Sequence, residues 1–209
     1  MFKWKPDHVI ARFLTRLADL FLLQLLFLLT SIPVVTIGAS ISATYSACRK
    51  LHYDNVSGIP SCFFRAFAAN WKQATVAWLL FLCAVFVVFV GLQYYTVDNA
   101  LRLVGRIVIF LIAIAVYLVS LYLFPMIAWL EQPLFARMKN ALVLSLIHLK
   151  TTLMATGILV AACLVARYLY PVFLFCGISA TSYILSLLFL NTLRKYSSDL
   201  VPQEIPAEE

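Results

Sequence analysis

The chain has 209 residues, of which 64% are hydrophobic and 12% are charged, and its formal net charge is +7. A soluble domain could not bury this much apolar surface, and the charged residues are too few to keep it in water. Because the basic residues are scattered along the chain and form no patch with stacking aromatics, we expect no nucleic-acid partner. The lipid bilayer is therefore the expected solvent of this protein.

Long uncharged runs indicate how the chain crosses the bilayer. Ala74–Tyr95, Ile107–Leu130 and Tyr168–Leu193 contain no Asp, Glu, Lys or Arg, and each provides the roughly 20 apolar residues that cross about 30 Å of hydrocarbon. Continuous apolar runs predict helices, whereas barrel strands would alternate. We expect an all-α membrane protein, a compact bundle of five to six membrane-embedded helices, with helices near Val104–Leu130 and Ala141–Ala166 among them.

The first hydrophobic region, Val9–Cys48, contains Pro33 near its middle. Proline removes a backbone donor and disfavours helix at the residue before it, so we expect a break near Ser31 or Ile32. A single crossing of this region would give five spans, whereas a proline-broken hairpin would give six membrane-entering helices. The second arm of such a hairpin, Val34–Cys48, is short and either spans the membrane or is partly re-entrant.

The distribution of Lys and Arg distinguishes these two topologies. If the first region crosses once, 9 of the 16 basic residues lie on one side and 7 on the other. If it returns as a hairpin, 13 share one side and only Arg102, Arg106 and Arg167 lie opposite. Because cytoplasmic connections are enriched in Lys and Arg, the hairpin topology is favoured, with both termini in the cytoplasm.

The two ends of the chain need separate interpretation. Lys3, Lys5, Arg12 and Arg16 precede the apolar run Leu20–Leu29, which imitates a secretory signal, but we expect it to be retained because the rest of the chain is also membrane-bound. Residues 1–196 are expected to form a single integral membrane helical domain. Residues 197–209 are expected to be an acidic, disordered tail.

The second arm of the hairpin carries small residues at helical spacing. Gly38, Ser42 and Ser46 recur every four residues, and three alanines follow them one position later. Small side chains let helix backbones approach closely, so this arm should be central in the bundle. A face with Thr36 and Ser40 could instead line a polar pathway. The candidate packing or functional residues are Pro33, Thr36, Gly38, Ser42 and Ser46.

Residues 60–73 combine aromatic and basic side chains in a helical pattern, with the aromatics on one face and the basic residues opposite. This pattern predicts an amphipathic interfacial helix on the cytoplasmic membrane surface. A weaker version follows at 133–150, where Phe135, Met138 and Leu142 share a face and Arg137 and Lys139 lie elsewhere. The interfacial residues predicted in the first segment are Phe63, Phe64, Arg65, Phe67, Trp71 and Lys72.

Three patches of the sequence resemble a known family. They are Leu29–Ser40, then Phe63–Phe67 with Asn70–Thr75, and Lys139–Ala141 leading to His148 and Thr152. Together they resemble the YesL-like family of bacterial integral membrane proteins, a domain of unknown function. Members look like companions of carbohydrate-uptake systems. The resemblance implies a multi-pass protein of the bacterial cell membrane with no assigned catalytic residues, and a membrane transporter subunit as its partner.

Asp19 is the acidic residue that lies within a hydrophobic region. Acidic residues inside membranes often bind coupling ions, but Arg16 lies one helical turn away and could form an interfacial pair with it. Our leading hypothesis is an accessory or interaction subunit that packs against a membrane partner through the small-residue arm and the amphipathic segment. The alternative is a small solute carrier or channel that uses Asp19, Gln24, Thr36 and Ser40.

Enzymatic and metal-binding motifs are not evident in the sequence. It has no phosphate-binding glycine loop, nucleophile elbow or His-Glu-x-x-His helix, so we expect no enzyme and no cofactor. His52 and His148 lack a clustered third ligand, and the five cysteines show no metal-like spacing, so no metal site is expected either.

Overall fold

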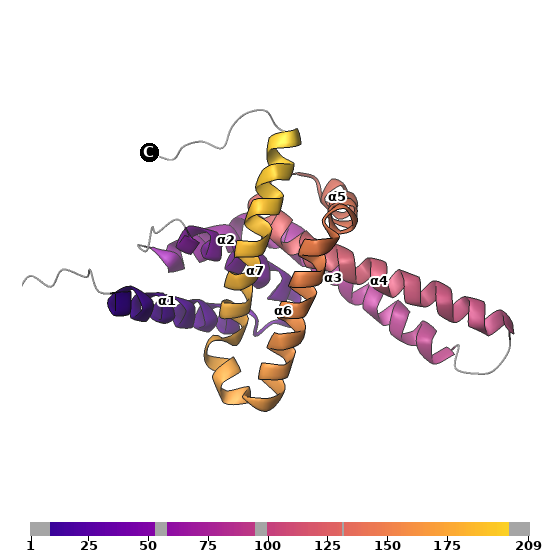
Figure 1. Cartoon of the computed structure of the whole chain (residues 1–209), viewed down its shortest axis with the longest axis horizontal. Helices are drawn as coiled ribbons and strands as arrows, with labels where there is room; N and C mark the ends of the chain where they lie inside the picture. Colours follow the sequence, from indigo (N-terminus) through magenta and orange to yellow (C-terminus); the bar gives the residue numbers. More distant parts are fainter. Residues whose placement is uncertain (1–8, 53–57, 95–99, 131, 201–209) are drawn as a thin grey trace, which may run out of the picture.

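The computed structural model describes residues 9–52, 58–94, 100–130 and 132–200. Over these residues the chain forms helices and no strand (Figure 1). This confirms the predicted all-α class. The elements are α1 (Val9–Thr30), the short 3-10 helix η1 (Val34–Thr36), α2 (Ile37–His52), α3 (Ile59–Tyr94), α4 (Ala100–Trp129), α5 (Leu134–Ile147), α6 (Leu149–Tyr168) and α7 (Tyr170–Leu200).

Three helices within the described part of the chain are long and apolar enough to cross a membrane. They comprise Ile59–Gln93, Leu103–Trp129 and Leu149–Tyr168, and α7 contains a shorter apolar stretch, Cys176–Leu190. By length and composition these helices are compatible with a membrane protein. The count of five to six membrane-embedded helices stays a prediction beyond these three.

The first hydrophobic region is broken at its proline, as the sequence predicts. Helix α1 ends at Thr30, Pro33 is extended with φ −76° and ψ 117°, and α2 begins at Ile37 after the turn of η1. Figure 1 shows α2 returning beside α1. We call α1, η1 and α2 together the first hairpin.

Helix α3 differs from the prediction, because no separate interfacial helix is present over 60–73. One continuous helix of 36 residues includes that segment and the following apolar run. Pro60 occupies the first turn, where proline is tolerated, and no Gly or Pro follows until Gly91. At 1.5 Å per residue the helix is about 54 Å long, well beyond the thickness of a bilayer core.

The predicted helix Ala141–Ala166 is divided between two helices in the structure. The helix breaks at His148, with φ −100° and ψ 52°, which separates α5 from α6. The Thr152 hydroxyl donates to the Ser145 carbonyl oxygen at 2.8 Å and to that of His148 at 3.1 Å, so a side chain occupies two acceptors next to the break. The short turn predicted between the last two spans is confirmed, since only Leu169 separates α6 from α7.

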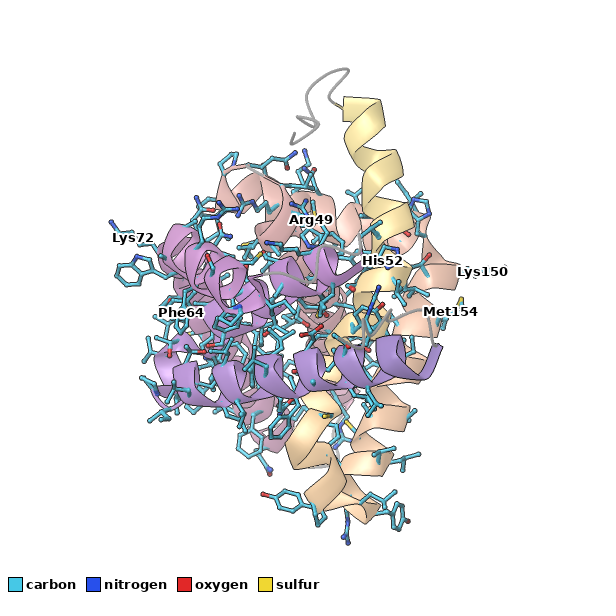
Figure 2. All side chains as sticks on the ribbon, turned by 90° about the vertical axis from the view of Figure 1, so that its left-hand side faces the viewer. Arg49, His52, Phe64, Lys72, Lys150 and Met154 are labelled. Carbon is cyan, nitrogen blue, oxygen red and sulfur yellow. The ribbon has the colours of Figure 1, made fainter. Side chains whose placement is uncertain are left out.

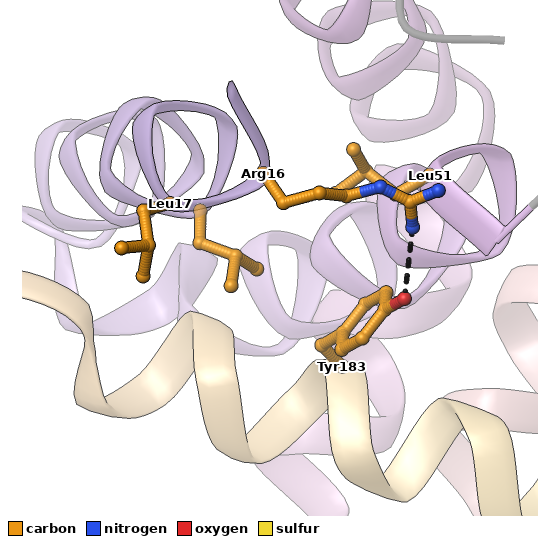
Figure 3. Close-up of a pocket in the computed structure, with 5 residues that line it drawn as sticks. Arg16, Leu17, Leu51 and Tyr183 are labelled. Atoms are coloured by element: carbon orange, nitrogen blue, oxygen red, sulfur yellow. Dashed lines mark hydrogen bonds between the residues drawn. The ribbon is translucent and has the colours of Figure 1, made fainter. Parts of the chain in front are cut away.

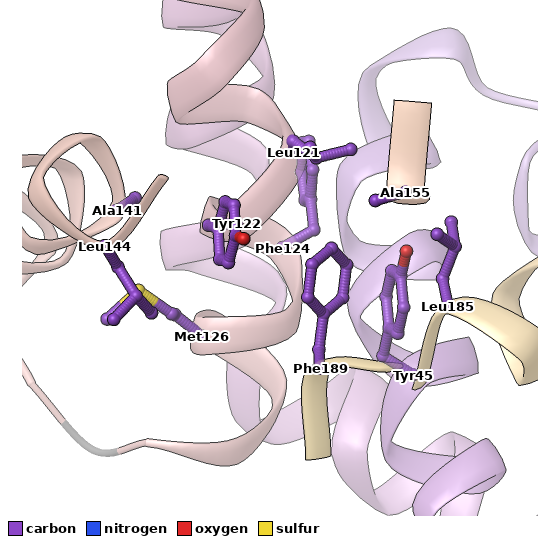
Figure 4. Packing of buried hydrophobic residues seen from close by; sticks show 10 residues of the cluster. All are labelled: Tyr45, Leu121, Tyr122, Phe124, Met126, Ala141, Leu144, Ala155, Leu185 and Phe189. Carbon is purple, nitrogen blue, oxygen red and sulfur yellow. The ribbon is translucent and has the colours of Figure 1, made fainter. Parts of the chain in front are cut away.

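Helix α2 lies in the centre of the bundle, where it contacts α1, α3, α4 and α7. Ten of its residues are buried. A buried cluster, drawn in Figure 4, joins α2 to α4 and α7. The ring centroids of Tyr122 and Phe189 lie 4.8 Å apart in it, and Tyr45 belongs to the same cluster. The core is thus built around the small-residue arm. Helix α7 continues to Leu200, four residues into the predicted tail, and 201–209 lie outside the described residues.

Candidate functional site

The proline break in the first hairpin is closed by hydrogen bonds from side chains. The Thr36 hydroxyl donates to the carbonyl oxygens of Thr30 and Pro33, both at 2.7 Å, and the Trp78 indole N–H donates to that of Val34 at 2.9 Å. The hydroxyls of Thr30 and Ser40 lie 2.8 Å apart. Three carbonyl oxygens at the break, those of Thr30, Pro33 and Val34, therefore have hydrogen-bond donors within the protein.

Gly38 marks a close approach between α2 and α3. A Cβ at this position would lie 2.6 Å from the Ala74 carbonyl oxygen and 2.6 Å from the Trp78 Cβ, with a Phe124 ring carbon at 3.3 Å. Only a residue without a side chain fits such a backbone contact without displacement. The close packing expected for this residue occurs against α3 of the same chain.

Ser42 and Ser46 lie on the same arm in different surroundings. Ser42 is completely buried, and its hydroxyl has no hydrogen-bond partner among the residues that the structure describes. The Ser46 hydroxyl donates to the Ala128 carbonyl oxygen on α4 at 3.2 Å, and nearby the Trp129 indole donates to that of Tyr45 at 3.2 Å. These bonds fix α2 against the end of α4.

The small-residue arm is therefore an internal packing element. Neighbouring helices of the chain cover both of its stripes: Gly38, Ala39, Ser42, Ala43 and Ala47 are buried, and Ser46 is partly buried. Surface that is already filled cannot receive a second protein. The expectation that this arm packs against a partner is corrected accordingly, because the hairpin folds back into its own bundle.

Arg16 and Asp19 lie on α1 but face different surroundings. The Arg16 guanidinium donates to the Tyr183 hydroxyl on α7 at 3.0 Å, beside a cavity of about 290 Å³ (Figure 3). Leucines from α1 and α2 complete this cavity: Leu17, Leu20 and Leu51. Asp19 is not part of its lining. The Asp19 Oδ2 atom is buried and has no hydrogen-bond partner within the described segments.

Among the α1 residues whose side chains the structure describes, Gln24 is the most buried polar one, with 1% of its surface exposed. Its Oε1 atom accepts from the Ser179 backbone N–H at 3.0 Å and from the Ser179 hydroxyl at 3.2 Å, while its Nε2 atom has no partner in the described part of the chain. Our sequence reading included Gln24 but not Ser179. The available signal was the spacing of Ser179, Ser182 and Ser186, which places three small residues on one face of α7.

The predicted aromatic face of 60–73 is divided in the structure. Phe63 is fully buried and Phe67 is partly buried against the first hairpin, whereas Phe64 and Trp71 are about half exposed. Figure 2 shows Phe64 and Lys72 on the outside of the molecule. The Lys72 ammonium lies 5.8 Å from the centroid of the Trp71 ring, a cation–π distance, and Arg65 is also exposed. One side of the segment is therefore part of the core, because it packs against α2, and the other side is surface.

In α5 the residues predicted to share an apolar face differ in exposure, and one of the basic residues is buried. Phe135 is 82% exposed, whereas Arg137 is only 3% exposed and donates to the Gln73 Oε1 atom on α3 at 2.7 Å. Met138 and Leu142, predicted to share a face with Phe135, are partly buried. An apolar membrane segment can leave Phe toward lipid, while an arginine close to that segment gains by turning toward a protein acceptor. Sequence reasoning missed this pair because Gln73 and Arg137 are far apart in the chain.

The residues that could carry chemistry do not converge on one centre. No group of three or more His, Cys, Asp or Glu side chains with metal-binding geometry occurs among the described residues. Thr36 and Ser40 lie at the proline break, Gln24 contacts α7, and none of the three lines the cavity beside Arg16. The geometry supports tight helix packing more directly than a shared binding centre.

Comparisons with known proteins give a family-model match for the first part of the chain. No curated protein and no solved structure matches the sequence. A family model described as "Protein of unknown function, DUF624" matches residues 20–92, which include the first hairpin from Leu20 onward and almost all of α3. Residues 20–92 are thus similar to the DUF624 family, and the YesL-like resemblance is consistent with that match.

Proposed function

We propose that this protein is an accessory or interaction subunit of a membrane complex, associated with carbohydrate uptake in the bacterial cell membrane. The observation that carries the proposal is the α3–α4 hairpin, whose outer half projects away from the other helices in Figure 1. Its side chains point outward around both helices: Phe86 is 65% exposed and Phe110 is 60% exposed. The sugar-uptake part of the proposal follows from the YesL-like resemblance.

The outer half of this hairpin has much surface and few neighbours. Gly91 of α3 approaches Ile109 of α4 closely, so the two helices contact each other there. Their remaining apolar faces are open to lipid or to another membrane helix. Helices in bilayers associate by van der Waals packing, and a two-helix projection offers more packing surface than a helix embedded in its own bundle. We therefore place the partner surface on the α3–α4 hairpin, with a membrane-spanning helix as its partner.

Site-specific photocrosslinking in native membranes tests this assignment. A photoreactive residue at Val87 or Phe110 should yield a reproducible crosslinked protein, identified by mass spectrometry, in cells grown on the inducing sugar. Leu153 on α6 is the matched control, because it is apolar and 65% exposed but lies outside the hairpin. Crosslinks to lipid alone at both hairpin positions, or recovery of the chain only as an isolated protein after sugar induction, would contradict the proposal.

A small solute carrier is the second candidate function, and two atoms of α1 favour it. Asp19 Oδ2 and Gln24 Nε2 are buried without hydrogen-bond partners among the described residues. Buried polar groups usually have partners, and intramembrane carboxyl groups are candidates for ion coupling. Proteoliposomes containing the pure protein should then move a solute, and Asp19→Asn should reduce the flux at equal protein content. Absence of flux over a broad panel of sugars and ions leaves the accessory role as the better proposal.

A further inference from the structure

We propose that the first hairpin is re-entrant: it enters the bilayer from the cytoplasmic side, and its tip ends among the lipid acyl chains without reaching the outer face. The tip consists of Ile32, Pro33, Val34 and Val35. Ile32 is 74% exposed, Val34 61% and Val35 49%. Turns in water favour Gly, Asn, Asp and Ser, so an exposed turn of large apolar residues fits a hydrocarbon surrounding.

The hydrogen bonds at the tip fit the same surrounding. Irregular backbone inside a membrane must find its partners within the protein, whereas a turn in water can leave carbonyl oxygens to solvent. At this break the carbonyl oxygens of Thr30, Pro33 and Val34 all accept from side chains, namely Thr36 and Trp78. The Ser31 N–H donates to the Phe27 carbonyl oxygen at 3.0 Å. A water-exposed turn would not need this set of bonds.

The arms of the hairpin are too short to span the bilayer. From Arg16 to the end of α1 at Thr30 the helix rises by about 21 Å, and from Ile37 to Arg49 α2 rises by about 18 Å, at 1.5 Å per residue. The hydrocarbon core is about 30 Å thick. Any tilt of the hairpin reduces its depth further. With its charged residues at the interface, the tip therefore stops inside the core.

Helix α3 provides an independent measure of depth. The tip contacts it at Trp78, and Gly38 contacts it at Ala74. Beyond Trp78, α3 continues for 16 residues to Tyr94, which adds about 24 Å in the direction away from its beginning. At the opposite end of α2, Cys48 packs in the same cluster as Phe63, so α2 runs antiparallel to the first half of α3. The first hairpin therefore lies beside only the first half of α3, and the second half of α3 extends beyond the tip.

Charge fixes the side from which the hairpin enters. The last turn of α2 contains Arg49, Lys50 and His52, whereas the tip contains no charged residue. Basic residues also lie on the first half of α3, at Arg65 and Lys72. Because Lys and Arg concentrate on the cytoplasmic side, the open end of the hairpin faces the cytoplasm. The exposed surface of the tip is apolar, so we expect it to contact the lipid acyl chains.

Cysteine accessibility in oriented membrane vesicles tests the proposal. In a chain whose five natural cysteines are replaced by alanine, Val34→Cys is compared with Ser61→Cys at the start of α3 and Leu169→Cys in the α6–α7 turn, both exposed positions. A membrane-impermeant maleimide should label Ser61→Cys only in inside-out vesicles and Leu169→Cys only in right-side-out vesicles. Val34→Cys should be labelled in neither. A nitroxide at position 34 should respond to oxygen more strongly than to a water-soluble nickel chelate.

The other outcomes overturn the re-entrant hairpin. Labelling of Val34→Cys together with Leu169→Cys would show a full crossing, and labelling together with Ser61→Cys would place the tip in cytoplasmic water. If the cysteine-free chain does not insert into the membrane, photocrosslinking takes the place of maleimide labelling. A diazirine amino acid is then introduced at position 34 of the chain that keeps its natural cysteines. Adducts to phospholipid acyl chains, detected by mass spectrometry, are the expected result. Adducts to water or to headgroups only would overturn the proposal.

Discussion

The Arg137 guanidinium donates to the Gln73 Oε1 atom at 2.7 Å, which joins α5 to the long helix α3. Arg137 is 3% exposed, so its charge is held inside the protein. Met138, which follows it, packs against the buried cluster of α2, α3 and α4. A short helix that is connected to α4 and α6 in sequence is thus also fastened to α3 by a charged hydrogen bond.

Replacement of Arg137 should destabilise the bundle. Arg137→Ala removes a charge-assisted hydrogen bond worth about 1.5–3 kcal/mol and leaves an acceptor on Gln73 without it. We expect a lower thermal unfolding midpoint in mild detergent, measured by circular dichroism. Lys139→Ala is the matched control because Lys139 is exposed on the same helix. Equal midpoints for the two variants would show that the Gln73 contact contributes nothing.

Gly38→Ala should be damaging, although alanine favours helix. The added Cβ would lie 2.6 Å from the Ala74 carbonyl oxygen and from the Trp78 Cβ, so α2 and α3 must separate. Overpacking of this kind typically costs about 1–3 kcal/mol. Gly157→Ala on α6 is the control: no atom lies within 4 Å of its added Cβ, and it should be neutral or stabilising by up to about 1 kcal/mol. Unfolding in detergent with increasing SDS measures both, and a Gly38→Ala variant as stable as Gly157→Ala would contradict the close approach.

The sequence predicts those features of the fold that depend on local chemistry. Pro33 breaks the first region because proline cannot donate and restricts its neighbour, and the uncharged runs become apolar helices because the hydrocarbon leaves few alternatives. The continuation of α3 through residues 60–73 was not predicted. An amphipathic pattern shows which face is apolar, but it does not show whether that face meets lipid or a neighbouring helix.

The candidate site was less predictable than the fold for a similar reason. Small residues at Gly38, Ser42 and Ser46 predict close packing, yet the pattern cannot tell whether the neighbour is the same chain or another protein. The pairs Gln24–Ser179 and Arg137–Gln73 join residues far apart in sequence, so their identification requires the helix arrangement. A single sequence carries no signal for such pairs beyond the spacing of polar residues.

The indole N–H of Trp78 should matter more than its ring. Trp78→Phe keeps an aromatic side chain but leaves the Val34 carbonyl oxygen without its donor, and a hydrogen bond of this kind contributes about 0.5–1.5 kcal/mol. We expect a measurable loss of stability in detergent. Trp71→Phe on the same helix provides the control, since Trp71 is half exposed. Similar losses of stability in both variants would show that the indole ring, and not its hydrogen bond to Val34, stabilises the protein. The hydrogen bond would then contribute nothing at the tip.

The hydroxyl of Thr36 should be required at the break. Thr36→Val preserves the shape of the side chain but removes the donor that reaches the carbonyl oxygens of Thr30 and Pro33, both at 2.7 Å. Thr36→Ser retains the hydroxyl and loses only a methyl group. We expect Thr36→Val to unfold at lower SDS than Thr36→Ser, by an amount equivalent to about 1–2 kcal/mol. The reverse order would mean that the methyl group, and not the hydrogen bonding, stabilises the break.

The natural cysteines offer a test of burial that needs no mutation. Cys48 on α2 is completely buried, whereas Cys62 near the start of α3 is partly exposed. With the cytoplasmic face opened, an impermeant maleimide should modify Cys62 and leave Cys48 unmodified, and in sealed right-side-out vesicles it should modify neither. Denaturation in SDS should then release Cys48 to the reagent, which proves that its protection depends on the fold. Peptide mass spectrometry resolves the two sites. Rapid modification of native Cys48 would contradict the central position of α2, because Cys48 belongs to one buried cluster with Leu23 and Phe63.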